Sequence, residues 1–574
     1  MNMARMIRCA RGEEPADLVL TGGRIINVFT GEITPGGVGV AEGRIIGVGD
    51  YKAPNTVDLG GRYLCPGFID AHVHIESAMT AIPGFVRAVL PRGTTTVVAD
   101  PHEIANVLGT DGIRYMLSAS EGQPMNIYFT LPSCVPATDM ETSGADLPAA
   151  ALMPFFGEAR ILALGEMMNY PGVLAGAPDP LLKIRAARTH RKRVDGHSPG
   201  VTGYDLNAYI SAGIWSDHEC TTPREAAEKL AAGMYIMIRE GTGARNLDDL
   251  LPVVTERNHH RIMWCTDDRH PHDLLEEGGI DSMVRRAIAG GLDPIIAIRM
   301  ATLNPARYFG LSHLGAVSPG RRADMVVFSD LAEPRPEMVF SQGIQRVVDG
   351  RWVEGTTVSE PPPPPSAMAV SPGRIDLRAP ASGARMRVIE LVRDQIVTRQ
   401  AVEEAALSGG LAIADVSRDL LKIAVVERYT GKGGLGIGFV RGFKLRGGAI
   451  ASSVAHDSHN LIVVGTNDAD MTAALETVVE MGGGLAAVRD AGGPQELLET
   501  LPLPIAGLMS DAPLGDVRDG MDGVIGATRK MGCPLADPFM ILSFLALPVI
   551  PSLKITDKGL VDVGRFCFVP LFID

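Results

Sequence analysis

The residues best suited to chemistry are two histidines one residue apart, in the segment Asp70-Ala-His72-Val-His74. Alternate residues of a β-strand point to the same face, so a strand ending here would present both imidazoles to one point. Imidazole is the commonest neutral protein ligand for Zn, Mn or Fe. An isolated His-x-His pair is also frequent in solvent-facing loops, so the pair alone does not decide between a metal site and a loop.

Further candidate ligands end other apolar runs in the middle of the chain. Glu166 ends RILALGE, while His197 and His218 lie at the ends of KRVDGHS and AGIWSDHE. Asp267 and Asp268 end RIMWCTDD. Six imidazole and carboxylate ligands are enough for two divalent ions with a bridging carboxylate and a bridging water, which suits Mn or Fe, with Zn as the third candidate. The predicted metal ligands are His72, His74, Glu166, His197, His218 and Asp267.

These residues need a scaffold that brings strand ends together. Apolar, β-rich runs recur in this part of the chain, and stretches of helix length separate most of them. Eight such units predict an α/β fold, a (β/α)₈ TIM-like barrel, whose chemistry lies at the carboxyl ends of the strands. The predicted strand runs are 66–74, 94–103, 126–133, 160–166, 192–198, 212–219, 234–240 and 261–268.

Two β-rich segments with glycine turns flank the barrel, at 17–62 and 323–355, and we expect them to pair into one small β-sandwich domain. The run Pro361 to Pro365 is typical of a stiff linker. The chain after it is long enough for a separate α/β or α+β domain. The predicted domains are 1–64 with 320–356 (β domain), 65–319 (barrel), 357–374 (proline-rich linker) and 375–574 (C-terminal domain).

Composition excludes several classes of protein. The formal net charge of −14 argues against a nucleic-acid-binding surface, which needs excess Lys and Arg. Seven scattered cysteines without a CxxC spacing indicate a reducing cytoplasm. The first 17 residues have no apolar core, so we expect no signal peptide. The apolar stretch Phe539 to Leu553 is short and contains Pro548 and Pro551, so we expect it to be protein core rather than a membrane span.

Several motifs together resemble a known family. PGFIDAHVHIE and ATLNPARYFGL…LGAVSPGRRADMVVF resemble the amidohydrolase superfamily. HVHIESAM, GTTTVVADPHEIANVLG, GEMMNYPGV, DGHSPG, SDHE and CTDDRHP are similar to the bacterial-type adenine deaminase family, as is GGAIASSVAHDSHNLIVVG (447–465) in the C-terminal part. The resemblance covers nearly the whole chain except the linker. It implies hydrolytic deamination of adenine to hypoxanthine and ammonia, at a binuclear Mn or Fe centre that activates hydroxide.

The resemblance also implies roles for individual residues. His72 and His74 match the ligands of the more buried metal, and His197 and His218 match those of the second. Asp267 matches an aspartate that ligates metal and moves the proton between water and the leaving ammonia; a carboxylate that only holds metal is the alternative.

One departure from related enzymes is informative. Many binuclear relatives bridge their metals with a carboxylated lysine on the fourth strand, but Lys183 and Lys192 lie well after that run here. Glu166 is the carboxylate placed to take this role, so we count it with Asp267 among the catalytic residues. This difference favours the deaminase over the hydantoinase and dihydroorotase pattern.

Several other polar residues could each have more than one role. His102 and Glu103 could contact the purine, bind a further ion, support the metal ligands or cap a helix. Glu219 and Asp268 are weaker candidates for the same substrate-binding or supporting roles. His456 and His459 are structural, or belong to a loop that covers the barrel mouth. The glycine-rich Gly431 to Gly438 lacks a phosphate-loop ending, so we expect a turn between strands.

Two other functions compete with adenine deamination. A different amidohydrolase reaction, either cyclic amide hydrolysis or deamination of a modified or different base, would need different substrate contacts at the same metal centre. A scaffold without activity would require missing ligands, and none is missing. The expected partners are a small purine and further copies of the chain in a homo-oligomer (dimer or higher), with neither nucleic acid nor membrane.

Overall fold

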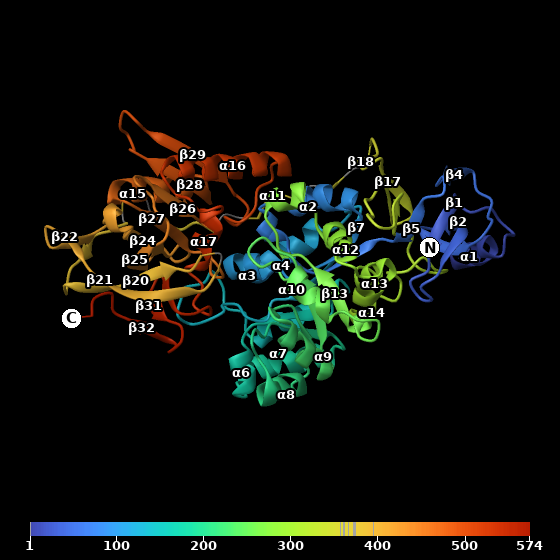
Figure 1. Cartoon of the computed structure of the whole chain (residues 1–574), viewed down its shortest axis with the longest axis horizontal. Helices are drawn as coiled ribbons and strands as arrows, with labels where there is room; N and C mark the ends of the chain where they lie inside the picture. Colours follow the sequence, from blue (N-terminus) through green and yellow to red (C-terminus); the bar gives the residue numbers. More distant parts are fainter. Residues whose placement is uncertain are drawn as a thin grey trace.

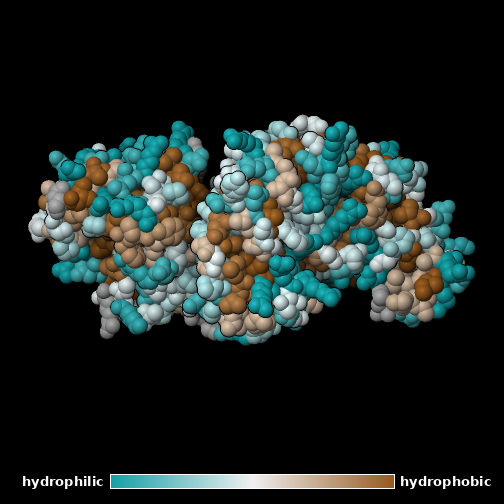
Figure 2. Space-filling model, turned by 90° about the horizontal axis from the view of Figure 1, so that it is seen from below, coloured by the Kyte–Doolittle hydropathy of each residue, from teal (hydrophilic) through white to brown (hydrophobic). Residues whose placement is uncertain are grey.

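The computed structural model describes residues 2–355, 358–359, 362–364, 367–370, 373, 375–393 and 395–573. The molecule is elongated, with the N-terminal strands at one end, the C-terminal strands at the other, and a helix-rich part between them (Figure 1). From below, hydrophilic and hydrophobic residues are mixed over the visible face (Figure 2). The predicted linker at 357–374 lies partly outside the described residues, including Pro361 and Pro365.

The two flanking segments share one nine-stranded sheet. Strand β5 pairs with β1 on one side and with β15 on the other. Strand β15 follows the parallel strands in the sequence, and its Met325 lies opposite Pro66. Residues such as Leu20, Val38 and Phe340 form its buried core. The predicted pairing is therefore present, while the sandwich form stays a prediction. The strands are β1 (Leu18–Ile26), β2 (Ile33–Ala41), β3 (Arg44–Val48), β4 (Asn55–Asp58), β5 (Tyr63–Pro66), β15 (Met325–Phe328), β16 (Met338–Ser341), β17 (Ile344–Val348) and β18 (Arg351–Trp352).

Seven of the eight runs between these segments form one strand each and the last, 261–268, forms two; the nine strands lie in two parallel sheets. The first has the order β10-β9-β8-β7-β6-β14, and the second has the order β11-β12-β13. β6 and β7 are buried along their whole length, as expected for apolar strands covered on both faces. The strands are β6 (Phe68–His74), β7 (Thr94–Ala99), β8 (Asn126–Leu131), β9 (Ile161–Met167), β10 (Arg193–Gly196), β11 (Ser216–Asp217), β12 (Tyr235–Arg239), β13 (Ile262–Cys265) and β14 (Asp267–Asp268).

Helices follow most of these strands and cover them from outside (Figure 1). Their starts are encoded locally: the Thr222 hydroxyl accepts the backbone N–H of Glu225, and Pro223 opens the helix. The helices of residues 1–319 are α1 (Met3–Ala10), α2 (Ile82–Val89), α3 (His102–Leu108), α4 (Thr110–Ala119), α5 (Ala149–Leu152), α6 (Tyr170–Leu174), α7 (Pro178–Thr189), α8 (Gly203–Ser211), α9 (Pro223–Ala231), α10 (Leu247–Leu250), α11 (Pro271–Glu276), α12 (Ile280–Ala289), α13 (Pro294–Met300) and α14 (Leu303–Tyr308).

The C-terminal part is β-rich. Its main sheet has eight strands in the order β21-β20-β25-β24-β27-β26-β28-β29, and helices α15 and α16 pack against β28. Two three-stranded sheets, β19-β23-β22 and β30-β31-β32, complete it. The elements are β19 (Ala379–Pro380), β20 (Arg385–Leu391), β21 (Thr398–Glu404), β22 (Ala406–Ser408), β23 (Leu411–Ile413), β24 (Leu421–Val426), β25 (Leu435–Arg441), β26 (Ala449–Ser452), β27 (Leu461–Gly465), α15 (Asp468–Glu480), β28 (Gly484–Arg489), β29 (Leu497–Pro502), α16 (Leu514–Lys530), α17 (Pro538–Phe544), β30 (Leu553–Thr556), β31 (Gly559–Asp562) and β32 (Cys567–Val569).

The apolar stretch from residue 539 to 553 is part of this core. Phe539, Leu542, Leu545 and Leu553 are buried. Across the described ranges, we find no helix whose length and apolar character would let it cross a membrane.

The C-terminal part contacts loops that follow the parallel strands. After β6, Thr80 forms a backbone bridge with Ser510. After β8, the backbone N–H of Thr142 donates to Asp557 Oδ1 at 2.9 Å, and the Thr142 hydroxyl donates to Asp557 Oδ2 at 2.6 Å. The C-terminal part therefore lies against the carboxyl ends of the strands, on the side where the predicted ligands are.

Candidate metal centre and active site

The first-strand histidines converge as their spacing predicts. The Nε2 atoms of His72 and His74 lie 3.0 Å apart at the buried end of β6. His74 Nδ1 lies 3.0 Å from the backbone carbonyl oxygen of Asp100, which can only accept a hydrogen bond. The proton is therefore on Nδ1, and Nε2 keeps its lone pair for a metal.

Glu166, at the end of β9, separates two groups of histidines. Its Oε1 atom lies 3.3 Å from His74 Nε2 and 3.8 Å from His72 Nε2. Its Oε2 atom lies 2.7 Å from His197 Nδ1 and 3.3 Å from His218 Nε2. Burial raises the pKa of Glu166, but hydrogen bonds from the surrounding histidines hold it well below its usual range. One ionised carboxylate thus faces both groups, with one oxygen toward each.

Asp267 completes the group around β6. Its Oδ1 atom lies 3.1 Å from His74 Nε2 and 3.5 Å from His72 Nε2. The residue has a φ of 57°, a left-handed conformation that is costly for a residue with a Cβ atom. The next residue turns elsewhere: Asp268 accepts a hydrogen bond from Ser77 Oγ at 2.5 Å. The local backbone therefore directs Asp267, rather than Asp268, toward both histidines.

These donors form several groups that could hold a cation. Three of them share residues: His72 with His74 and Glu166, His72 with His218 and Asp267, and Glu166 with His197 and His218, all with donor atoms within 4.8 Å of one another. Neutral imidazole and carboxylate donors suit divalent Mn, Fe or Zn. The geometry therefore fits the metal site that the sequence predicts, and all six predicted ligands lie in it.

The four weaker candidates also lie close to this centre. His102 Nδ1 is 3.2 Å from Glu166 Oε1, and the Glu219 Oε1 atom is 3.5 Å from His218 Nε2. Asp268 has a carboxylate oxygen within 4.8 Å of the donor atoms of His74 and Asp267. Glu103 faces the C-terminal part instead of the metal ligands, as described below.

Neither nearby lysine reaches the centre. Lys183 Nζ donates to the carbonyl oxygen of Ser133 at 2.9 Å, and Lys192 Nζ donates to that of Ile161 at 2.5 Å. Among the residues that the structure describes, Glu166 is therefore the side chain of the fourth predicted strand that lies between the two histidine groups.

Arg239 is a site residue that the sequence analysis missed. It ends β12 and is buried, with Nη1 donating to Asp267 Oδ2 at 2.9 Å and Nη2 to Glu219 Oε2 at 2.9 Å. Burial raises the pKa of Asp267, but hydrogen bonds from His72 and His74 and the charge of Arg239 hold it well below its usual range. The only sequence signal was its place at the end of a predicted strand.

Lys229 is a second site residue that the sequence analysis missed, and it holds the sequence neighbours of two predicted metal ligands in place. Its fully buried Nζ lies 2.7 Å from the Ser198 carbonyl oxygen and 2.9 Å from Asp217 Oδ2. Ser198 directly follows His197, and Asp217 directly precedes His218. Asp217 Oδ1 also accepts the Ser198 backbone N–H at 2.8 Å. The network ties the ends of β10 and β11 together.

We expect Lys229→Met to unfold more easily and to bind less metal. Removing one partner of a buried ion pair leaves the other charge uncompensated, which costs about 3–5 kcal/mol of unfolding free energy. Denaturant unfolding and metal analysis measure both effects. Lys192→Met is the matched control, because the hydrogen bonds of that lysine go to backbone carbonyls at the start of β9 and just before it. Equal effects of the two substitutions would contradict a special role for Lys229.

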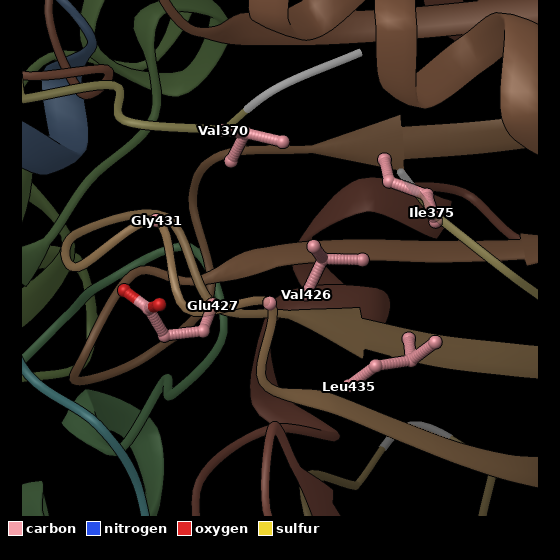
Figure 3. A pocket seen from close by; sticks show the side chains of 7 residues that line it. Val370, Ile375, Val426, Glu427, Gly431 and Leu435 are labelled. Atoms are coloured by element: carbon pink, nitrogen blue, oxygen red, sulfur yellow. The ribbon is translucent and has the colours of Figure 1, made fainter. Parts of the chain in front are cut away.

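A different hollow, in the C-terminal part, carries no such chemistry. Val370, Ile375, Val426 and Leu435 give it an apolar lining, and Glu427 is its charged residue (Figure 3). The Glu427 carboxylate accepts hydrogen bonds from its own loop: the Tyr429 N–H, and the Thr430 N–H and hydroxyl, the last two at 2.6 Å each. The loop joins β24 to β25, so the first half of the glycine-rich segment, 431–434, lies in a turn between strands as predicted, while 435–438 belong to β25.

Comparisons with known proteins agree with this geometry. The Amidohydrolase family matches residues 63–358, and the Adenine deaminase C-terminal domain matches residues 395–567. An adenine deaminase of Desulfatibacillum aliphaticivorans is 54% identical, covering 99% of this chain and 99% of that protein. The chain belongs to the adenine deaminase family. An adenine deaminase of Kosmotoga olearia is 47% identical over 100% of this chain and 99% of that protein.

Solved structures of other amidohydrolases are more distant from this adenine deaminase family member. The beta-aspartyl dipeptidase of Fervidobacterium islandicum AW-1 is 15% identical, with a TM-score of 0.46, covering 60% of this chain and 99% of that one. The family assignment therefore rests on the full-length relatives, and it confirms the resemblance found in the sequence motifs.

Proposed function

We propose that the chain hydrolyses adenine to hypoxanthine and ammonia. The observation that carries this proposal is the 54% identity, along nearly the full length of both chains, to a protein named adenine deaminase. The six clustered histidine and carboxylate ligands support it, because a family member that had lost its chemistry would not need them.

We further propose two divalent ions per chain, Mn or Fe, with Zn as the third candidate. His72, His74 and Asp267 would hold one ion, His197 and His218 the other, and Glu166 would contact both. When bound, such ions lower the pKa of water enough to supply hydroxide at neutral pH.

The protein's own residues then handle orientation and protons. Arg239 occupies Asp267 Oδ2, so Oδ1 is the oxygen that faces the histidines. Ammonia is a poor leaving group until it is protonated. We assign the Asp267 carboxylate to accept the proton of the attacking water and to return it to the amino group of adenine. Glu166 contributes by fixing the two groups of histidines on either side.

We also propose how the parallel strands are arranged, on the basis of contacts between them. The edge strands β10 and β11 lie in contact, as do β13 and β6, so we infer that the two parallel sheets close into a (β/α)₈ barrel. We also propose the domain division at residues 65, 320, 357 and 375. Cytoplasmic location and a homo-oligomeric state stay predictions.

A substrate panel tests the proposed reaction. We expect Mn-loaded protein to release ammonia from adenine far faster than from adenosine, and not to open cyclic ureides such as hydantoins. Time courses of ammonia release and of ring opening, measured on one preparation, give the comparison. Turnover of hydantoins or dihydropyrimidines with no reaction of adenine would favour the alternative amidohydrolase reaction.

A further inference from the structure

Glu103 is held by two histidines from a distant part of the chain. It lies in the first turn of α3, after β7, whereas His456 and His459 lie in the loop between β26 and β27. His456 Nδ1 is 2.8 Å from Glu103 Oε1, and His459 Nε2 contacts Glu103 Oε2. All three side chains are at least nine-tenths buried. The C-terminal part therefore fixes a carboxylate beside the metal centre.

The hydrogen bonds decide what this cluster can bind. Three such donors could hold a cation, but the backbone N–H of Ala455 donates to His459 Nδ1 at 3.2 Å. Burial lowers the pKa of His459 to about 4, so the ring is neutral and its one proton must be on Nε2. Nε2 then donates to Glu103 and has no lone pair for a metal. The cluster is thus an ionised carboxylate held by N–H donors.

The same carboxylate faces a small pocket. Glu103 and His456 line it together with Glu76, and Met79 and Leu508 provide apolar walls. Glu76 Oε1 accepts the Ile104 N–H at 3.3 Å, whereas its buried Oε2 has no partner among the described residues. Apolar walls with a few converging polar atoms are typical of a site for a small ligand. A buried oxygen without a partner indicates that the ligand supplies a donor.

Glu103, in the wall of this pocket, also lies close to the reaction centre. The His102 ring spans the gap, with Nδ1 3.2 Å from Glu166 Oε1 and Nε2 3.5 Å from Glu103 Oε1. The His102 ring and its two contacts thus link Glu103 to Glu166, the carboxylate that faces both histidine groups. A flat bicyclic base can cover that span while its amino end stays at the metal ligands.

We propose that Glu103 recognises the ring N–H of free adenine, with Glu76 as a second purine contact and His456 and His459 as positioning residues. The proposal rests on the proposed deamination. A carboxylate only accepts hydrogen bonds, so it matches the imidazole-ring N–H of the free base. A nucleoside or a 9-alkylated base lacks that proton, so this contact would favour adenine over adenosine. The C-terminal part thereby contributes to substrate selection.

Glu103→Gln tests the recognition step. The amide keeps the shape but loses the charge, so we expect the KM for adenine to rise about 10–100-fold while kcat changes far less. The preference for adenine over 9-methyladenine should fall by a similar factor, because it depends on the same hydrogen bond. Calorimetric titration of hypoxanthine, the product, which keeps the imidazole-ring N–H and is not consumed, measures the affinity independently of turnover.

Two further variants separate positioning from folding. His456→Phe keeps the stacking on Phe544, whose ring centre lies 4.7 Å away, but donates nothing to Glu103. We expect a smaller rise in KM, and no additional rise when it is combined with Glu103→Gln. Asp557→Asn is the control, because Asp557 joins the same two parts of the molecule through Thr142, outside the pocket. It should leave KM unchanged.

Each result that would contradict these proposals points to a different conclusion. Unchanged adenine affinity in Glu103→Gln, or an equal rise in KM in Asp557→Asn, would overturn the recognition role. Loss of one bound ion from Glu103→Gln or His456→Phe would show a metal site in its place. Absence of ammonia release by the wild-type chain would contradict the proposed reaction, while the calorimetric comparison would still decide on Glu103.

Discussion

Removal of divalent metal is expected to abolish adenine deamination, and the purified protein is expected to hold close to two divalent ions per chain. His72→Ala and His197→Ala should each lower metal content together with turnover, because they remove imidazoles on opposite sides of Glu166. The loss of activity should exceed the roughly 10–100-fold cost of losing an outer-shell partner of a metal ligand. Elemental analysis and ammonia release on the same samples measure both quantities.

The same experiment includes restoration of the metal and a control variant. Adding Mn to chelated wild-type protein should restore activity, and it should restore the alanine variants poorly. His260→Ala, at an exposed histidine, should keep both metal and activity. Full activity in a metal-free preparation would contradict the metal assignment and the mechanism built on it.

Asp267→Asn is expected to lose about 10²–10⁴ in kcat, the usual contribution of general acid–base catalysis. Asparagine has nearly the same shape and keeps one oxygen ligand, but it cannot accept a proton at neutral pH. Its amide NH2 then faces Arg239 and cannot accept from it, but the metal-facing oxygen is kept, so adenine affinity and metal content should change less than kcat. Steady-state kinetics with metal analysis separates these quantities.

Asp268→Asn is the matched control. Its side chain accepts a hydrogen bond from Ser77 and does not contact Arg239, so we expect a milder effect. An inactive Asp268→Asn beside an active Asp267→Asn would exchange the roles of the two residues. Retention of activity by both would assign the proton to another group, with Glu166 and His218 next.

Much of this site was predictable because it follows from local rules. The eight strands were visible as apolar runs, and the fold places the carboxyl ends of parallel strands together. His72, His74, Glu166, His197, His218 and Asp267 each lie at such an end, so their convergence needed no further information. The alternation of side chains along a strand predicted different directions for Asp267 and Asp268, and a left-handed backbone at Asp267 also contributes to its direction.

The remaining contacts depend on pairings that no local pattern encodes. Glu103 and His456 are 353 positions apart, and their contact requires that the C-terminal part lie on the strand ends. Arg239 and Lys229 look like ordinary charged residues of a strand and a helix. Only the packing shows that the first pairs with Asp267 and the second with Asp217.

The shared nine-stranded sheet has a consequence for how the chain is made. Strand β5 pairs with β1 soon after synthesis, but its other neighbour, β15, is translated only after the whole run of parallel strands. Until then β5 presents an open edge, which is a template for wrong pairing with another chain. Such long-range pairing also forms slowly. We therefore expect truncations before residue 325 to aggregate, and the arrival of β15 at β5 to be the step that joins the two halves of this sheet.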